Sequence, residues 1–456
     1  MNTLIKKKFH SIVGDDHFRD RPEDLISYSY DAFTVEAAPD LVLLPVSTTQ
    51  ISEILKLASE HRIPVTARGA GSSICGAPVP IHGGIVLSMT MMNKILETNT
   101  ADRYCIVEPG VINGDLQVEL AKTGFFYPPD PGSMAFSTIG GNLAQNAGGP
   151  RCLKYGVTSD YVLGMEVVLA SGEVIRFGSR NVKDVTGYRL SGLFCGSEGT
   201  LGIVTEITLK VLPQPEAYRT VLAVFNNLDD SAATVSDIIG AGILPAALEL
   251  LDKVLINVVE DANNIGLPRG AEGLLLIEVD GSEEQVEKEL ALITGKARNN
   301  NAVDIQQART PAEREALWRA RRSLYSCMAR LKPNCIVEDA TVPASKLPEM
   351  IRGIRAIINK YGLLAGISAH AGDGNMHPLI SCDMRDQEEM ERVDKAIEEI
   401  FKLAMACNGT LSGEHGIGIA KRKYLSMSID EPTLNFMHTL KHAVDPHGIL
   451  NPGKAI

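Results

Sequence analysis

The stretch "PPDPGSMAFSTIGGNLAQNAGGPRCLKYG", residues 128–156, decides the fold, because it is too rich in glycine, asparagine, serine and threonine for an ordinary helix or strand. Two other segments share this texture: "RGAGSSICGAPVP" (68–80), which follows a predicted strand, and "CGSEGTLGIVTEITLKVLP" (195–213). Glycine lets a backbone approach a ligand closely, and exposed backbone N–H groups form anion-binding concavities. Each segment alone is explained as a surface turn cluster. Together they indicate the walls of one ligand site, since so much glycine carries an entropic cost.

The sequence around these segments predicts two domains of different texture. The segment 68–80 does not fit a dinucleotide-binding Rossmann turn, because its third glycine comes only at Gly76 and no clear helix follows. From about residue 216, long polar-apolar helices such as 282–300 alternate with apolar strands such as 273–281. This pattern predicts an α+β second domain, with a boundary near residues 213–215.

Composition excludes several classes of protein. A chain of 456 residues with 45% hydrophobic and 22% charged residues is typical of a soluble globular protein with two or three domains. The net charge of −12 argues against a nucleic-acid partner. No signal peptide and no transmembrane segment are expected. The 8 cysteines form no CxxC pair, which argues against a cysteine-ligated iron–sulfur or zinc site and is typical of a reducing cytoplasm.

The stretch "HAGDGNMHPLI" (370–380) places His370 and His377 seven residues apart. Its glycines disfavour a helix, and on a straight strand an odd spacing sends the two side chains to opposite faces. The two imidazoles therefore converge only if the GDGN stretch is a tight loop. A pair of histidines is weak support for a metal site, which needs a third ligand and an open position.

A third ligand is offered by "CNGTLSGEHGIG" (407–418), where Glu414 and His415 are flanked by glycines. Alone, this stretch is explained equally well as a solvated loop. Combined with the two histidines, it completes a set of two imidazoles and one carboxylate, which suits Zn, Mn or Fe(II) and leaves positions open for substrate.

The stretch "REALWRARRSLYSCMARL" (314–331) predicts one amphipathic helix. Three of its arginines fall on the polar side, but Arg321 falls inside or beside the apolar stripe. An arginine in that place either extends its charged end to solvent or pairs with a buried negative charge. The pattern leaves both alternatives open.

Residues 38–215 resemble the PCMH-type FAD-binding domain of the vanillyl-alcohol oxidase superfamily, whose motifs match 68–77, 138–149 and 196–205 in order. The resemblance continues to "DPHGILNPGK" (445–454) and is closest to the D-2-hydroxyacid dehydrogenases and the glycolate oxidase FAD subunit. It implies a two-domain α+β flavoprotein. The expected parts are an FAD-binding domain (1–215), a substrate or cap domain with a metal site (216–440) and a C-terminal segment that returns to the FAD domain (441–456).

The same resemblance implies a set of FAD-binding residues that line the phosphates, the ribityl chain and the flavin. They are Arg68, Gly69, Ala70, Gly71, Ser72, Ser73, Gly76, Ala77, Pro129, Asp130, Ser133, Thr138, Gly140, Gly141, Asn142, Ala144, Ala147, Gly149, Glu198, Gly199, Gly202, Ile203 and Val204. Relatives with covalent FAD often carry a histidine in the first loop. This chain has Ser73 and Ile74 there, so non-covalent FAD is expected.

In the site that the resemblance implies, His370, His377 and Glu414 ligate a divalent metal and Asn375 helps to position the substrate. His415 is the catalytic base. The alternative is that His415 only supports the side chains around the site and does not act on the substrate. The family also places a carboxylate-binding arginine three residues after a tryptophan, and Trp318 plus three is Arg321.

The expected reaction is oxidation of a short D-2-hydroxy acid, D-lactate or glycolate, to the 2-oxo acid. Hydride goes to flavin N5 and electrons pass to an electron-transfer flavoprotein, an iron–sulfur subunit or a quinone. Tyr325 and Val337 stand where relatives acting on diacids carry further polar residues, which favours monoacids over D-2-hydroxyglutarate. A homo- or hetero-oligomer is expected, in the cytoplasm or peripherally at the membrane. The alternatives are an aryl-alcohol or sugar oxidase without a metal role, a metal-dependent hydrolase without flavin, and a non-catalytic flavin-binding subunit.

Overall fold

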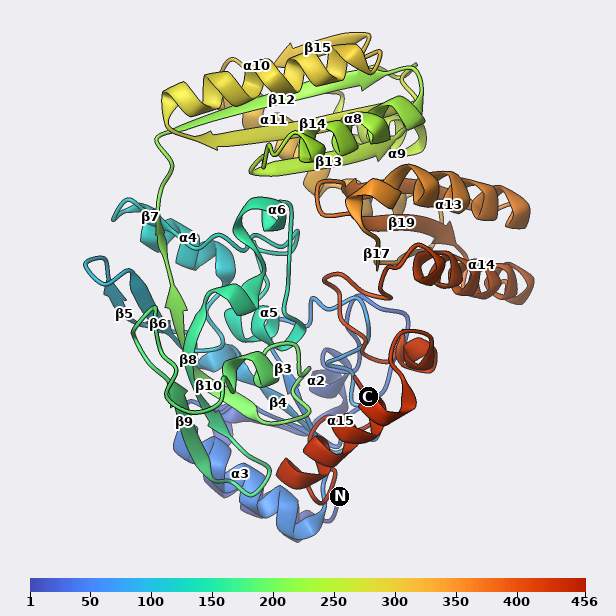
Figure 1. Cartoon of the computed structure of the whole chain (residues 1–456). Coiled ribbons are helices and arrows are strands. Elements are labelled where there is room, and N and C mark those ends of the chain that lie inside the picture. Colours follow the sequence, from blue (N-terminus) through green and yellow to red (C-terminus); the bar gives the residue numbers. More distant parts are fainter. The chain divides into compact units, whose positions relative to one another are not determined.

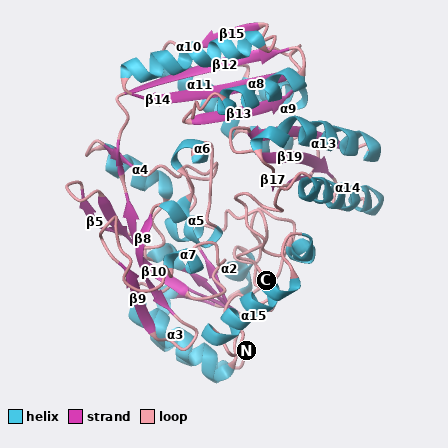
Figure 2. Ribbon diagram, viewed as in Figure 1, coloured by secondary structure: helices cyan, strands magenta, loops and turns pink.

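The computed structural model describes all residues, 1–456, and the chain divides into two compact units. Unit 1 comprises 1–148, 157–214 and 414–456, and unit 2 comprises 149–156 and 215–413. Helices and strands are mixed in both units (Figures 1 and 2). The division at 214/215 falls where the change of sequence texture is expected. The contact units differ from the expected domain ranges in two places: 149–156 belongs to unit 2, and 414–440 belongs to unit 1.

The first half of unit 1 is built on a four-stranded sheet in the order β1-β2-β4-β3. Its strands are β1 (Phe18–Arg19), β2 (Leu41–Leu43), β3 (Val65–Arg68) and β4 (Ile85–Ser88). Strands β2 and β3 each pair in parallel with β4, and α3 (Thr48–His61) connects β2 to β3. The α3 side chains Ile51, Ile54, Leu55 and Ala58 are fully buried in the core of this sheet, as helical periodicity requires.

A second, antiparallel sheet of unit 1 has the order β5-β6-β10-β8-β9. Its strands are β5 (Ile95–Asn99), β6 (Tyr104–Val107), β8 (Val162–Val168), β9 (Val174–Gly178) and β10 (Ile203–Lys210). A short pair joins β7 (Phe125–Phe126) to β11 (Leu212–Pro213). The remaining α-helices of unit 1 are α1 (Thr3–Val13), α2 (Pro22–Ile26), α4 (Asn113–Ala121), α5 (Ile139–Gln145), α7 (Ser191–Phe194) and α15 (Glu431–Val444).

Unit 2 is built on an antiparallel sheet in the order β15-β12-β14-β13-β18-β19-β16, with β17 also paired to β19. The strands are β12 (Ala217–Phe225), β13 (Ala247–Asp252), β14 (Gly273–Gly281), β15 (Asp304–Gln307), β16 (Asn334–Val337), β17 (Ala340–Thr341), β18 (Leu364–His370) and β19 (Asn375–Cys382). The helices are α6 (Cys152–Tyr155), α8 (Leu228–Gly240), α9 (Lys253–Asn263), α10 (Glu283–Asn299), α11 (Pro311–Arg322), α12 (Leu324–Met328), α13 (Leu347–Tyr361) and α14 (Gln387–Ala406). Helices α8 and α10 pack on β12 and β14, and α9 packs on β13 and β18 (Figure 1).

The helix expected over 314–331 is interrupted in the structure. It forms α11 and α12, with Ser323 between them. The Ser323 hydroxyl donates to the carbonyl of Ala320 at 2.8 Å and accepts from Asn263 at 3.1 Å. Serine that bonds to a nearby carbonyl competes with the regular helical pattern, so the expectation of one continuous helix was wrong at this residue.

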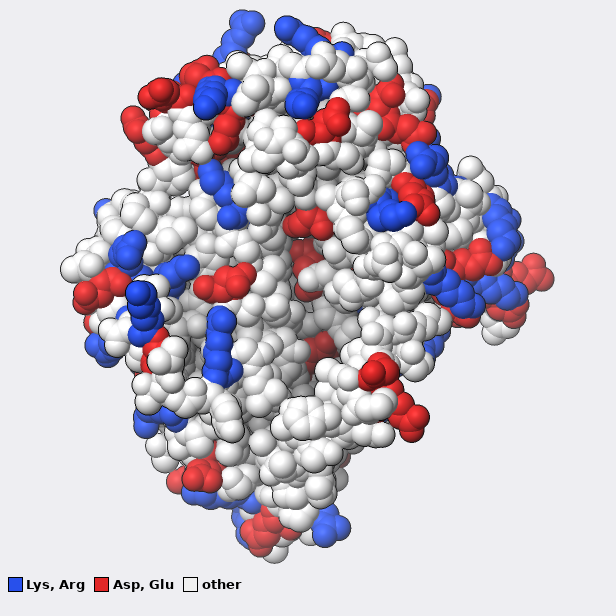
Figure 3. All heavy atoms as spheres, viewed as in Figure 1, with Lys and Arg blue, Asp and Glu red and all other residues white.

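The surface carries charges of both signs. On the face drawn in Figure 3, basic and acidic side chains are interspersed. Many are joined in ion pairs along the helices, such as Lys402 with Glu398 at 2.6 Å and Lys346 with Glu349 at 2.8 Å. None of the helices is both long enough and apolar enough to cross a membrane.

Candidate functional site

A tight hairpin brings the two histidines of 370–380 together. In the β18–β19 register His370 lies opposite Asn375 and Ser368 lies opposite His377. Opposed residues of paired strands point to the same face, so both imidazoles share one face of the hairpin. Their ring centroids are 5.0 Å apart in an edge-to-face arrangement, and both residues are buried. The expectation of a tight loop at GDGN is confirmed. Because the chain reverses in this loop, the two histidines do not point to opposite faces, as they would on one straight strand.

The hairpin turn depends on a glycine. Gly374 has φ of +78°, and a Cβ at this position would overlap the carbonyl oxygen of Val342. Only glycine satisfies both conditions without strain. The close approach of 342 to the turn is part of the pairing that also places β17 against β19.

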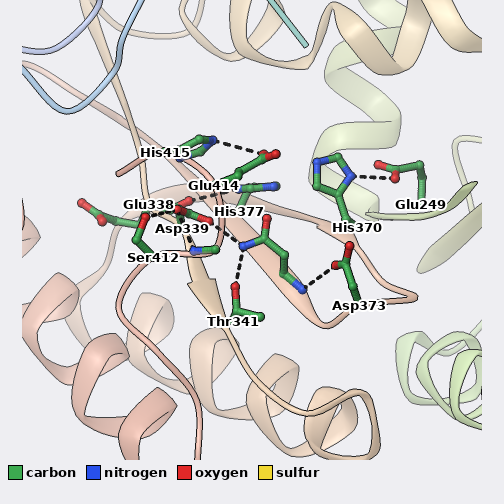
Figure 4. A network of polar contacts seen from close by, with 12 residues as sticks. Glu249, Glu338, Asp339, Thr341, His370, Asp373, His377, Ser412, Glu414 and His415 are labelled. Atoms are coloured by element: carbon green, nitrogen blue, oxygen red, sulfur yellow. Dashed lines mark hydrogen bonds and ion pairs between the residues drawn. The ribbon is translucent and has the colours of Figure 1, made fainter. Parts of the chain in front are cut away.

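A buried carboxylate on the neighbouring strand holds His370. Glu249 of β13 lies directly opposite His370 in the β13–β18 register, and its side chain is fully buried. Glu249 Oε1 lies 2.7 Å from His370 Nδ1, and Oε2 accepts a hydrogen bond of 2.6 Å from Arg321 Nε (Figure 4 shows the pair with His370). Burial acts to raise the pKa of Glu249, but the charges and hydrogen bonds of Arg321 and His370 outweigh it and hold that pKa below its usual value.

Arg321 therefore pairs with buried negative charge, the second of the two alternatives that the sequence pattern leaves open. Both Nε and Nη2 lie 2.6 Å from Glu249 Oε2. Only Nε makes a hydrogen bond; Nη2 is buried and has no hydrogen-bond partner, so this nitrogen keeps donor capacity for a ligand.

A second buried carboxylate, Asp339, contacts the other strand of the hairpin, β19, at the residue opposite His370. It accepts hydrogen bonds from Asn375 Nδ2 at 2.5 Å, from Ser412 Oγ at 2.5 Å and from the backbone N–H of Gly413 at 3.0 Å (Figure 4). Asn375 Nδ2 also donates to Thr341 Oγ1 at 2.8 Å. The amide nitrogen of Asn375, a residue expected to position substrate, is thus engaged within the protein.

Glu414 and His415 follow Gly413 directly in the chain, so Asp339 fixes the backbone one residue before them. Gly413 has no room for a side chain, because a Cβ there would overlap Asn375 Nδ2 and Thr341 Oγ1. Glu414 Oε1 and His415 Nε2 lie 3.4 Å apart, and both side chains are largely buried. Glu249 and Asp339 are not among the site residues predicted from the sequence. The adjacent acidic pair in "CIVEDA" (335–340), directly after an apolar run, is the signal that could have drawn attention to Asp339.

The donor set fits a divalent cation. The contact of His370 Nδ1 with Glu249 directs Nε2 of that ring to the other side. His377 Nδ1 lies 3.4 Å from the carbonyl oxygen of Glu338, a long contact with the same consequence for its Nε2. Two imidazoles in neutral form, with a carboxylate one residue beyond an anchored glycine, are ligands that zinc, manganese or iron accept.

The first glycine-rich segment, 68–77, is braced from within unit 1. Asp31 accepts hydrogen bonds from the backbone N–H groups of Gly76 at 3.0 Å and Phe33 at 2.8 Å. Arg68 is buried and donates from Nη1 to the carbonyl of Tyr30 at 2.7 Å. Burial raises the pKa of Asp31 to about 6. These contacts hold the loop in a fixed shape, as a ligand-binding wall requires.

The second and third segments meet the first. Thr138 caps α5 by accepting from the N–H of Gly141 at 3.2 Å, and a Cβ on Gly69 would overlap the Thr138 hydroxyl. Glu198 donates its N–H to the carbonyl of Ala144 at 2.9 Å. Its carboxylate accepts from the N–H groups of Ile417 at 2.7 Å and Gly418 at 2.9 Å.

The C-terminal stretch closes this arrangement. Asn451 Nδ2 donates to the carbonyls of Ala77 at 3.0 Å and Glu198 at 2.7 Å, and the backbone of 450 bridges to Val65. The structure thus brings the three segments together in unit 1 with the chain's last residues. Of the residues expected to bind FAD, Gly149 is the exception, since it begins the 149–156 segment of unit 2.

Comparisons with known protein families agree with this arrangement. Residues 214–455 match the model of the FAD linked oxidases, C-terminal domain, and residues 39–178 match the model of an FAD binding domain. The expectation of bound FAD rests on the same segments that the structure brings together.

Named relatives cover almost the whole chain. The glycolate oxidase subunit GlcD of Bacillus subtilis is 48% identical over 99% of this chain and 96% of the relative. The Escherichia coli K12 subunit of that name is 38% identical over 95% and 87%. A D-lactate dehydrogenase of Anaerostipes hadrus is 36% identical over 97% and 94%.

Two solved structures share this fold at low sequence identity. Substrate-bound p-cresol methylhydroxylase has a TM-score of 0.83 at 19% identity, over 99% of this chain and 96% of that one. Alkyldihydroxyacetonephosphate synthase has a TM-score of 0.77 at 20% identity, over 99% and 86%. The expected two-domain α+β fold of the vanillyl-alcohol-oxidase type is confirmed.

Proposed function

The chain belongs to the family of FAD-linked oxidases, and from that premise we propose that it oxidises a short D-2-hydroxy acid, D-lactate or glycolate, to the 2-oxo acid. The family makes it an FAD-dependent oxidoreductase. The observation that carries the choice of substrate class is the pair of buried imidazoles on one hairpin face, with a carboxylate fixing one of them. Relatives named as glycolate oxidase subunits and a D-lactate dehydrogenase support the same class.

A divalent metal is held by His370, His377 and Glu414. Within unit 2, His370 and His377 share one face of the β18–β19 hairpin, and Glu414 follows the anchored Gly413 in the chain. When bound, such an ion lowers the pKa of a substrate hydroxyl and orients the hydroxy acid. Zinc, manganese and iron(II) all suit two imidazoles and one carboxylate.

His415 takes the hydroxyl proton of the substrate. Its neighbour Glu414 keeps Oε1 3.4 Å from His415 Nε2, so the imidazole is orientated within the same short loop that Asp339 anchors. Arg321 binds the substrate carboxylate; Glu249 accepts from its Nε, while its buried Nη2 has no hydrogen-bond partner in the protein. Asn375 helps to position the substrate, and its Nδ2 donates to Asp339 and Thr341, which fixes the side chain.

FAD is held without a covalent bond by the three glycine-rich segments. When bound, it accepts the hydride from the substrate's α-carbon. The one thiol in the first loop, Cys75, is buried, and burial raises its pKa, which opposes its action as a nucleophile towards the flavin. Ser73 engages that cysteine by accepting from its N–H at 3.3 Å.

The electrons pass from the reduced flavin to a separate carrier. The relatives named GlcD are subunits of a glycolate oxidase, which supports a hetero-oligomer. The candidate acceptors are an iron–sulfur subunit, an electron-transfer flavoprotein and a quinone. We place the protein in the cytoplasm or peripherally at the membrane.

The test is anaerobic reduction of the bound flavin by a panel of hydroxy acids. D-lactate or glycolate is expected to bleach the flavin band, whereas L-lactate is not, and D-2-hydroxyglutarate tests the diacid alternative. The variant His415→Ala is expected to keep FAD but to lose reduction by a factor of about 10² or more, as loss of a general base predicts. A yellow protein that none of the four acids reduces contradicts the proposal.

A further inference from the structure

We propose that Glu249 is a positioning residue that holds both the metal ligand His370 and the substrate anchor Arg321, so that one buried carboxylate joins metal binding to carboxylate recognition. The proposal rests on the function proposed above. It assigns a role to a residue that touches neither metal nor substrate. Its support is the arrangement of the three side chains within unit 2.

Sheet pairing fixes Glu249 against His370. The β13–β18 register places the two residues directly opposite each other, so their side chains share one face of the sheet. Glu249 also pairs with Leu276 of β14 on its other edge, which makes β13 a central strand. The backbone that carries the Glu249 carboxylate is therefore held by paired strands on both sides.

The two oxygens of Glu249 are used separately. Oε1 contacts His370 Nδ1 at 2.7 Å, while Oε2 contacts Arg321 Nε and Nη2, both at 2.6 Å. A carboxylate that accepts from Nδ1 keeps the proton on that nitrogen and leaves the Nε2 lone pair for a metal. It also raises the basicity of the ligand nitrogen.

The same carboxylate sets the direction of Arg321. A guanidinium is planar and rigid, so the hydrogen bond from Nε and the ion-pair contact of Nη2 with one oxygen fix the direction of the whole group. Glu249 is fully buried, and an ionised carboxylate without partners is costly there. Loss of either partner therefore disturbs the other, because both neutralise one charge.

The experiment replaces the carboxylate with an amide of the same shape, Glu249→Gln. Glutamine has one acceptor oxygen and one donor NH2 group, so it cannot accept from His370 and Arg321 together. The chain offers a matched control in Glu278→Gln. Glu278 lies on β14 of the same sheet, is almost fully buried, and accepts from Arg314 Nε at 2.6 Å and Trp318 Nε1 at 2.8 Å.

The primary readout is the affinity of the FAD-loaded protein for Zn²⁺ and Mn²⁺, measured by competition with a chelator. Glu249→Gln is expected to weaken it about 10- to 100-fold, the range typical for loss of a histidine's carboxylate partner. The KM for D-lactate is expected to rise as well, while the FAD content stays that of the parent. Glu278→Gln is expected to leave metal affinity and KM unchanged.

Metal affinity within twofold of the parent in Glu249→Gln overturns the inference, as does an equal loss in Glu278→Gln. If Glu249→Gln does not fold, Glu249→Asp replaces it, since the shorter side chain keeps the charge but cannot reach both partners. Parent-like affinity in that variant also overturns the inference.

A parent that binds no metal overturns it together with the metal part of the proposed function. A parent that binds metal tightly, loses it in Glu249→Gln and yet is reduced by no hydroxy acid supports the metal positioning while contradicting the proposed reaction.

Discussion

At the scale of single residues, three buried carboxylates do most of the positioning. Glu249 fixes a histidine and an arginine, Asp339 fixes the backbone before Glu414, and Glu198 ties the glycine-rich segments to 417–418. Each accepts several hydrogen bonds in a place where an unpaired charge is costly. Removal of any one leaves several donors without their partner at once.

Asp339→Ala is expected to lower the free energy of unfolding by about 2–4 kcal/mol, because three donors to a buried charge lose their acceptor. Flavin reduction by substrate is expected to fall further than stability alone explains, since the loop with His415 loses its anchor. Urea unfolding and anaerobic reduction measure the two effects. Asp184→Ala, at an exposed position outside helices and strands, is the control and is expected to change stability by less than about 0.5 kcal/mol. Equal behaviour of the two variants would contradict the role of Asp339.

Burial raises the pKa of Glu198 from the usual 4.5 to about 7 in the folded protein. Because the folded pKa is the higher one, the contribution of this group to stability is fully present below pH 4.5 and is lost as the pH rises through about 7. The loss is at most about 3 kcal/mol. Glu198→Gln is expected to flatten this part of the profile, which urea unfolding at about pH 5 and about pH 8 can measure. An unchanged dependence on pH would show that Glu198 is ionised throughout.

Single residues also show what sequence alone could predict. The histidines and the Glu414–His415 pair carry their chemistry in short motifs with glycine neighbours, so they are visible without a structure. Glu249 and Asp339 are not, because Glu249 depends on strand register and Asp339 on hydrogen bonds, in both cases with residues far along the chain. Arg321 lies between these cases: the helical pattern left open both a buried partner and extension to solvent, and it could not identify the partner.

At the scale of elements, the β18–β19 hairpin decides the site, and its turn depends on Gly374. The loop of four residues converts an odd spacing of two histidines into a common face. The Gly-Asp-Gly-Asn composition of 372–375 predicts the loop, and the structure confirms it. The division of the 314–331 helix at Ser323 was not foreseen, because its hydroxyl bonds depend on Asn263 of a different helix as well as on a local carbonyl.

Gly374→Ala is expected to cost about 3 kcal/mol or more of unfolding free energy and to lower metal affinity, since it adds a clash with Val342 to the strain of a positive φ. The matched control is Gly362→Ala at the end of α13. That glycine also has a positive φ, of +59°, but a Cβ there meets nothing within 4 Å. Its expected cost is about 1–2 kcal/mol with metal binding retained. Thermal unfolding and chelator competition distinguish the two variants. Equal effects of both would contradict the role of the turn at Gly374 in metal binding.

At the scale of the whole molecule, the chain passes between its two units more often than a two-domain sequence pattern suggests. The segment 149–156 leaves the glycine-rich wall and joins unit 2, where Lys154 Nζ donates to the carbonyl of Asp280 at 2.6 Å and Tyr155 donates to its carboxylate at 2.8 Å. The last 43 residues, 414–456, return to unit 1. The sequence has no marked change of texture at these two places, so the crossings could not be predicted from it. The boundary at 214/215, by contrast, is marked by prolines.

The returning C-terminus is expected to be required for FAD binding. Asn451→Ala removes the hydrogen bonds to Ala77 and Glu198 and takes a partner from Lys454, whose pKa burial lowers to about 8. The dissociation constant for FAD is expected to rise at least about tenfold, equivalent to about 1.4 kcal/mol. Asn264→Ala is the control, because that residue has a similar positive φ but caps α9 in unit 2. Fluorescence titration of the apoprotein with FAD measures both, and equal affinities would contradict the role of the C-terminus.

The proposed function requires both a flavin and a metal for oxidation of a 2-hydroxy acid. Its most direct test is the anaerobic visible spectrum of the purified protein after addition of D-lactate or glycolate, before chelator treatment, after it, and after metal is restored. The account predicts bleaching of the flavin band that chelation abolishes and Zn²⁺, Mn²⁺ or Fe²⁺ restores, with FAD bound throughout. Bleaching that persists at the same rate in metal-free protein would contradict it.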